Sequence, residues 1–496
     1  MTLTDAPARP RPRGAGRASP ISLARLLGLE LRRNAMPWTF PLLAVLFVLD
    51  PFRTAMGYGP FWDLRASVLT NKLLPDFVAF VAGVAAWMGS RDNRRRTRDL
   101  VAATARPRWT AQLITWAATT LWAAAGFLCC LAVLYGVTAS QATWGGPPWW
   151  PAAVSLAELA LISALGFAVG TFFPSRFTAP LAAVGAFLLS LEGFRNAVGR
   201  SSTYALLSPT TYVPDDGTGL FRHFLPDVSI AQLMFLIGLT LVVLAALGLP
   251  QAADAGPRLR RTAAVIAVAG LAAAGTAVGL TGTARTGTYG TVIPALHDAA
   301  NDRPIPYTPV CGQAAGVPVC VHPAYRSFLP DVTADLAPVL REIASLPGAP
   351  ARVDQVAVND LTASMGAAIT GAPAVFRLPV PATPDETSFG QNASTFASNL
   401  KTTLVTAFVA GAPGFVPPGP PGGTPAQLAV ELALLQKAGK VTQTGSAAGN
   451  GQHAKAEQVA AAARRFAALP AATRHAWLAA HLAALRAGHI TLAQLP

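Results

Sequence analysis

Two of the four cysteines have the spacing of a disulfide. Cys311 and Cys320 bracket a short Gly-containing stretch that is typical of a hairpin. A disulfide closing so short a loop contributes about 2 to 3 kcal/mol and requires an oxidising compartment. The alternative is a pair of free thiols or metal ligands, although no further Cys or suitably spaced His completes a zinc set. Cys129 and Cys130 are adjacent within an apolar run, where we expect them to pack as small apolar groups.

The spacings of common catalytic and metal sites do not occur in the sequence. There is no G-x-x-x-x-G-K-[ST], so the chain does not hydrolyse nucleotides by the P-loop route. Neither G-x-S-x-G nor H-E-x-x-H is present. His475 and His481 are six residues apart, which places them on different faces of a helix. We therefore predict that the chain is not an enzyme and has no catalytic residue, metal site or cofactor.

Two carboxylates lie within apolar runs, where a charge is costly and often functional. Glu158 has no basic residue near it in the sequence, and Glu192 has Arg195 three residues further on. An ion pair on the helix surface is one interpretation of Glu192. For Glu158, a contact in a transport path and a hydrogen bond that fixes two helices both remain open. We consider both carboxylates as candidates for a transport path.

Apolar runs indicate an α-helical polytopic membrane protein with about seven transmembrane helices. Of the 496 residues, 52% are hydrophobic and 12% are charged. Most runs approach the roughly 20 residues that cross a bilayer as helix, and the first is the shortest. Gly275 and Gly279 have the G-x-x-x-G spacing of close helix packing. The predicted spans are Thr39 to Asp50 with its flanks, Leu74 to Met88, Leu113 to Val137, Ala152 to Phe172, Phe177 to Phe194, Val228 to Leu249 and Ala263 to Thr283.

Arginine predicts the orientation, because cytoplasmic loops retain basic residues. With seven spans, all strongly arginine-rich segments lie on one side. The net charge of +14 is mostly this signal. Since no nucleic-acid-binding module accompanies it, we predict no nucleic-acid partner. The N-terminus is therefore expected in the cytoplasm, and everything after Thr283 outside. The basic residues on the inner side are Arg9, Arg11, Arg13, Arg17, Arg25, Arg32, Arg33, Arg91, Arg94, Arg95, Arg96, Arg98, Arg106, Arg108, Arg176, Arg258, Arg260 and Arg261.

The chain divides into four predicted parts. Residues 1–18 are a disordered basic tail, 19–36 an amphipathic helix at the membrane interface, 37–283 the transmembrane domain and 284–496 an extracytoplasmic α+β domain. Within the last part we expect a hairpin around the cysteine pair. Further predicted elements are helices at Tyr325 to Ser345, Ala393 to Ala410, Pro425 to Ala438, Ala456 to Ala468 and Ala471 to Ala487, and strands at Arg352 to Val358 and Ala374 to Val380.

Three sequence stretches carry a family resemblance. They are LLGLELRRN in the N-terminal helix, RDNRRRTRDLVAATARPRW between the second and third spans, and LSPTTY at Leu207 to Tyr212. Together they resemble permease subunits of exporter-type (ABC-2-like) ABC transporters from high-GC Gram-positive bacteria, over roughly residues 20 to 250. The seventh span and the outer domain depart from the usual six-span core of that family.

The resemblance implies a permease subunit in the bacterial plasma membrane. In such families a separate ABC ATPase docks on a short coupling helix, and two permeases form a homodimer or heterodimer. The implied docking segment is Arg94 to Thr104. Two alternatives stay open: a membrane-tethered extracytoplasmic binding or enzymatic domain, and a sensor or scaffold without transport. The implied ATPase-coupling residues are Arg94, Arg95, Arg96, Arg98, Asp99 and Leu100.

Overall fold

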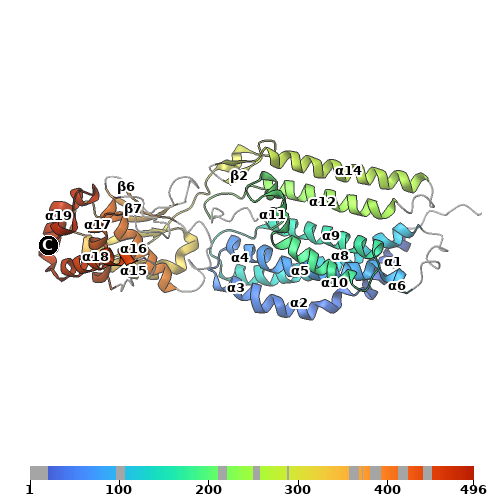
Figure 1. Ribbon diagram of the computed structural model, residues 1–496, viewed down its shortest axis with the longest axis horizontal. Coiled ribbons are helices and arrows are strands. Elements are labelled where there is room, and N and C mark those ends of the chain that lie inside the picture. The colour runs from blue at the N-terminus through green and yellow to red at the C-terminus, as the bar shows by residue number, and fades with distance from the viewer. Residues whose placement is uncertain are drawn as a thin grey trace, which may run out of the picture.

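The computed structural model is elongated, with a helical bundle at one end and a smaller mixed domain at the other (Figure 1). The N-terminal helix α1 (Pro20–Arg33) lies at the end of the bundle remote from the C-terminal domain. The structure describes residues 20–95, 107–210, 220–249, 257–287, 290–356, 368–370, 373–379, 393–411, 423–439 and 450–496.

Six helical stretches of the bundle are long and apolar enough to cross a membrane. Six of the seven predicted spans thus coincide with helices of suitable length and composition. The fifth, predicted at Phe177 to Phe194, is also helical, but its apolar part belongs to the shorter class. It consists of α10 (Thr178–Leu188), η4 (Leu189–Gly193) and α11 (Phe194–Val198), which follow one another directly. The six long stretches are Leu23–Gly57, Trp62–Gly89, Arg108–Gln141, Trp149–Phe172, Asp227–Gly248 and Pro257–Gly282.

The first two spans are each built from several helical pieces. Pro51 explains one break, because proline has no N–H for the helical hydrogen-bond ladder, and it lies in the π-helical segment η2. The pieces of the first span are η1 (Met36–Thr39), α2 (Phe40–Phe47), η2 (Val48–Phe52) and α3 (Arg53–Gly57). Those of the second are α4 (Trp62–Val68), the π-helical η3 (Leu69–Leu73) and α5 (Leu74–Gly89). The later spans are α8 (Arg108–Gln141), α9 (Trp149–Phe172), α12 (Asp227–Gly248) and α14 (Pro257–Gly282).

Glycine permits the closest helix contact of α5 with α9. A Cβ added at Gly170 would lie 2.0 Å from the Ala86 carbonyl oxygen, and one at Gly166 would lie 2.5 Å from that of Ala82. Gly166 and Gly170 thus form a working G-x-x-x-G pair. The sequence pointed to a different pair, Gly275 and Gly279, but neither has an atom within 4 Å of an added Cβ, so that face of α14 makes no close contact with the described residues.

Exposed aromatic side chains mark both ends of the bundle's lateral surface. Trp149 is 63% exposed at the start of α9 and Phe173 is 68% exposed just after its end. At 1.5 Å per residue these positions are about 36 Å apart along the helix, enough to bracket a hydrocarbon layer of about 30 Å. Trp38, 87% exposed, begins the first span at the α1 end. This arrangement is typical of the aromatic belts of membrane proteins.

The C-terminal domain, which we call the outer domain because it lies at the end of the molecule remote from α1, contains a five-stranded sheet in the order β3-β4-β5-β7-β6. The strands are β3 (Val310–Ala314), β4 (Val317–Val321), β5 (Arg352–Val356), β6 (Ala368–Thr370) and β7 (Val375–Pro379). Strand β5 runs parallel to β4 and β7, whereas β3 and β6 are antiparallel to their neighbours. The predicted α+β character, the hairpin and the strands β5 and β7 are confirmed. Strand β6 was not predicted.

Helices of the outer domain supply most of its core. They are α15 (Leu329–Ile343), α16 (Ala393–Ala410), α17 (Pro425–Lys437), α18 (Asn450–Ala468) and α19 (Ala471–Arg486). Leu336, Phe376, Phe408 and Phe466 are fully buried in one continuous cluster. Because this core begins at Ala314, the domain has its own apolar interior.

The segment that links the bundle to this domain belongs to the bundle by its contacts. It forms a hairpin of β1 (Arg285–Gly287) and β2 (Gly290–Val292). The fully buried Ile293 packs with Ala231 of α12 and Ala277 of α14. Its N–H donates to the buried carboxylate of Asp227 at 2.9 Å. The hairpin therefore covers the ends of α12 and α14 that face the C-terminal domain.

Candidate functional site

The start of the predicted coupling loop is fastened to the N-terminal helix. Arg91 opens the short helix α6 (Arg91–Arg94) and donates to both carboxylate oxygens of Glu30 in α1, at 2.8 and 2.9 Å. This bond to Glu30 is the main reason why the pKa of Arg91 is raised. A bidentate guanidinium–carboxylate pair fixes orientation as well as distance. The pair thus joins two segments that are 61 residues apart.

Helix α1 is in turn fixed to α8. The indole N–H of Trp122 donates to the Leu31 carbonyl at 2.9 Å. The Asn34 amide donates to Thr119 Oγ1 at 2.9 Å, a bond between buried groups. The two contacts hold the C-terminal end of α1 to the side of the bundle. The predicted helix over 19–36 is therefore present as α1, and its end is tied to a span.

The predicted coupling residues are only partly described. Arg94 lies over the Trp87 ring, 3.3 Å from its centroid, and donates to the Trp87 carbonyl at 2.8 Å. Arg95 is exposed directly after α6. The other four predicted coupling residues, Arg96, Arg98, Asp99 and Leu100, lie outside the described residues.

A cleft of about 210 Å³ opens beside this junction. Its wall includes Glu30, Arg91, Arg108 and Thr171, from α1, α6, α8 and α9. The Nε of Arg108 is buried and makes no hydrogen bond to the part of the chain that the structure describes. The cleft therefore has a mixed polar and apolar lining that contains two arginines, at the base of the loop.

Glu158 lies deep within the bundle and has one hydrogen bond. Its side chain is only 3% exposed. Ser190 of η4 donates to its Oε1 at 3.4 Å, and its Oε2 is buried without a partner among the described residues. The bond joins α9 to the predicted fifth span, which is one of the two roles left open by the sequence. The Glu192 side chain lies outside the described residues.

At the opposite end, an aromatic junction joins the bundle to the outer domain. Phe61, Leu220 and Phe221 of the bundle form one buried cluster with Val321 and Tyr325 of the outer domain. Polar contacts reinforce the junction: Thr143 Oγ1 donates to the Pro323 carbonyl at 3.1 Å, and the Ile305 N–H donates to the Phe221 carbonyl at 2.6 Å. We call this set of contacts the outer junction.

His322 lies at the centre of the outer junction. Its fully buried ring contacts those of Trp144, Phe221 and Tyr307, with centroid distances of 4.8, 4.7 and 4.4 Å. Its Nδ1 accepts the Ala324 N–H at 3.2 Å and so caps a short helix. The proton of the neutral ring is therefore on Nε2. Burial lowers the pKa of His322 to about 4, and the nearby Leu220 carbonyl offsets part of that shift.

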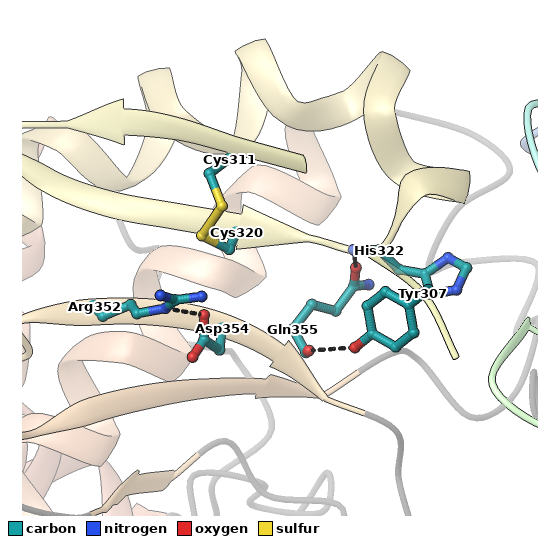
Figure 2. Close-up of a disulfide and its surroundings, with 7 residues drawn as sticks. All are labelled: Tyr307, Cys311, Cys320, His322, Arg352, Asp354 and Gln355. Carbon is teal, nitrogen blue, oxygen red and sulfur yellow. Dashed lines mark hydrogen bonds and ion pairs between the residues drawn. A yellow bond between two sulfur atoms is a disulfide. The ribbon is translucent and has the colours of Figure 1, made fainter. Parts of the chain in front are cut away.

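Gln355 at the end of β5 anchors this histidine to the sheet (Figure 2). Its side-chain oxygen accepts the His322 N–H at 2.7 Å, and its carbonyl accepts the Tyr307 hydroxyl at 3.5 Å. The predicted disulfide, Cys311–Cys320, is confirmed and crosses β3 and β4 close by. The pair also lies opposite in the strand register. The turn uses Ala315 and Gly316, both with positive φ of 53° and 85°, as a type I′ hairpin requires.

His475 and His481, considered above as a metal pair, make structural contacts. His475 lies 3.2 Å from Ser345 Oγ and 3.4 Å from Glu342. The His481 Nδ1 lies 2.9 Å from the Trp477 carbonyl. Across the described ranges, no three His, Cys, Asp or Glu side chains gather as a metal site would require.

Neither the outer junction nor the Glu30–Arg91 pair could be predicted from the sequence. Both join residues that are far apart in the chain. The residue types involved are common in helical bundles and loops, so they do not stand out in the sequence. Gln232 shows the same limit: its amide binds the Leu206 and Ser208 carbonyls at 2.9 and 2.8 Å. It thereby holds the described part of the LSPTTY stretch to α12.

Comparisons with protein families, curated proteins and solved structures find no match to this chain.

Proposed function

We propose that this chain is the membrane-spanning permease subunit of an exporter, driven by a separate ATPase that docks on the loop between α5 and α8. The Glu30–Arg91 pair carries the proposal. A motor that moves the bundle through a loop needs that loop to be rigidly tied to the spans. Here the first turn of the loop is bound to α1 by two charge-assisted hydrogen bonds, and α1 is bound to α8.

The same proposal gives the molecule its orientation. The arginine-rich loop faces the cytoplasm, where ATP is available, and the domain from β3 onward faces outward. Two observations support this arrangement. Helices α1 and α6 lie at the end of the bundle remote from that domain (Figure 1), and the Cys311–Cys320 disulfide suits an oxidising compartment.

Charge exchange at the Glu30–Arg91 pair tests the proposal. The chain is purified in mild detergent from its native host, and copurifying ATPase and ATP hydrolysis are measured for wild type, Glu30→Arg, Arg91→Glu and the double variant. Each single variant places like charges together, so we expect at least a fivefold loss of ATP hydrolysis. The double variant restores the opposite charges and should recover most of it.

Arg258→Glu and Arg260→Glu are the matched controls, because both arginines are exposed at the inner end of α14. They should leave hydrolysis within about twofold of wild type. If no ATPase copurifies with the wild-type chain, the proposal fails and a scaffold without transport is favoured. If the single variants retain full hydrolysis, the loop is not the coupling element.

A further inference from the structure

A charged pair lies on the outer face of the first two spans. Lys72 Nζ in η3 is 3.3 Å from Asp50 Oδ1 in η2 and 3.2 Å from Thr54 Oγ1. The Asp50 side chain is 65% exposed and that of Lys72 is 33% exposed. Asn71 is exposed beside them. The face therefore presents both signs of charge to its surroundings.

The pair lies near the middle of the distance between the aromatic belts. Asp50 follows Trp38 by 12 residues, so it is about 18 Å from the inner belt. Lys72 follows Trp62 by 10 residues, or about 15 Å of helix. Trp62 is level with the outer belt, because Tyr135 contacts both Trp62 and Trp149, at centroid distances of 5.6 and 5.8 Å. Both estimates place the pair well inside a hydrocarbon layer.

Lipid suits the rest of this face but not the pair. Leu42 and Val45 of α2 and Leu49 of η2 are exposed on the first span, as expected of a surface that faces acyl chains. Within the chain Asp50 is compensated by Lys72 and by a hydrogen bond from Thr54 Oγ1 at 3.3 Å. The exposed part of its carboxylate, however, has neither water nor headgroups to solvate it at this depth. A protein surface that is apolar but carries matching charges at the same depth would satisfy both the apolar side chains and the charged pair.

We propose that a second copy of this chain covers this face, related to the first by a two-fold axis along the membrane normal. Such an axis brings each residue opposite partner residues of equal depth. Asp50 and Lys72 have opposite charges at one depth, so the face is complementary to itself. Asp50 of each copy accepts a hydrogen bond from the partner's Lys72, and Leu49 packs near the axis.

The inference deepens the proposed function by naming the surface that pairs two permeases. It rests on the membrane embedding of the bundle and not on ATPase docking. The two ideas can therefore fail separately. A dimer that recruits no ATPase contradicts only the proposed function, and a monomer that recruits the ATPase contradicts only this interface.

Cysteine cross-linking tests the interface without disturbing its charges. In a Cys129→Ser, Cys130→Ser background, Leu49→Cys is oxidised in native membranes with copper phenanthroline. We expect more than half of the chain to run as a disulfide-linked dimer. Val265→Cys, on the equally exposed face of α14, is the control and should stay monomeric. Dimers through Val265→Cys with none through Leu49→Cys would overturn the proposal.

Exchange of the two charges is a second, independent test of the interface. The wild-type chain, expressed alone and reconstituted in nanodiscs, should have the mass of two copies. Asp50→Lys and Lys72→Asp place like charges across the interface, so each should raise the monomer fraction at least tenfold, whereas the double variant should restore the dimer. A wild-type chain that is monomeric when expressed alone overturns the proposal and favours a different permease as partner.

Discussion

His322 is the residue through which the two halves of the molecule contact each other most closely. Its ring packs against Trp144 and Phe221 of the bundle and Tyr307 of the linker, while its backbone N–H is bound to Gln355 of the sheet. A charged imidazole has no compensating carboxylate in this aromatic set. The neutral ring therefore stabilises the outer junction.

Acid should weaken the outer junction through this histidine. Its folded-state pKa of about 4 lies below the ordinary value of about 6.5, so the unfolded state binds more protons between these two pH values. Stability is then complete above pH 6.5 and falls as the pH drops towards 4. We expect a loss of about 2 kcal/mol between pH 7 and 4.5, measured as a lower midpoint of thermal unfolding in detergent.

His322→Asn is the control for this prediction, since asparagine also accepts a hydrogen bond from the helix N-terminus but does not titrate. It should be less stable than wild type at pH 7, because it loses aromatic contacts, and should show a smaller drop at pH 4.5. An equal drop in both proteins would assign the acid effect to other groups.

Contacts between individual residues could be predicted where the two residues are close in the sequence. Cys311 and Cys320 were recognised because a short hairpin and an outside location together favour a disulfide. His322 gave no such signal. Its partners Trp144, Phe221 and Gln355 come from three distant segments, and only the folded chain brings them together.

At the scale of elements, α5 and α9 pack closely because α9 has glycine, without a side chain, at the contact positions. A methyl group at Gly170 would meet the Ala86 carbonyl, a backbone atom that cannot rotate away. Gly170→Ala should therefore push the helices apart and cost at least 1 to 3 kcal/mol, about the range for overpacking a core. Gly275→Ala adds the same group to another span where no atom lies within 4 Å, and it should be neutral. Thermal unfolding of the two purified variants measures the difference; equal stability would contradict the assigned contact.

The hairpin of β3 and β4 depends on its disulfide. Cys311 and Cys320 should resist alkylation until a reductant is added. The double variant Cys311→Ser, Cys320→Ser should lower the stability of the outer domain by about 2 to 3 kcal/mol and leave the bundle inserted. Limited proteolysis of membranes checks this, with faster cleavage expected only within the outer domain. Alkylation of both thiols in the oxidised wild-type protein would exclude the bond.

Hydrophobic periodicity and helix-breaking residues predicted most helices and strands correctly. The helix predicted at Ala393 to Ala410 has those bounds in the structure, because its apolar repeat is long and sequence of different composition flanks it. The three-residue β6 is too short to show an alternating pattern. The close packing suggested by the spacing of Gly275 and Gly279 is not found, because spacing alone does not tell which face of a helix meets a neighbour.

At the scale of the whole molecule, the number of crossings decides which compartment holds each end. Six long helices alone would return the chain to its starting side, yet α1 and the C-terminal domain lie at opposite ends of the bundle (Figure 1). The additional passage is α10, η4 and α11, of 11, 5 and 5 residues. At 1.5 Å per residue these 21 residues rise about 31 Å, which matches the hydrocarbon thickness. We therefore propose this passage as a seventh crossing, which would reconcile the count with the arrangement.

Labelling from one side tests that crossing. In a Cys129→Ser, Cys130→Ser background, Gln458→Cys is placed on the exposed surface of α18 and Arg95→Cys at the exposed end of α6. A membrane-impermeant maleimide should label Gln458→Cys in intact cells, whereas Arg95→Cys should react only after the membrane is permeabilised. The opposite pattern would reverse the orientation. Labelling of both from the same side would mean that α10 to α11 does not cross, and the outer domain would then share a compartment with the arginine-rich loop.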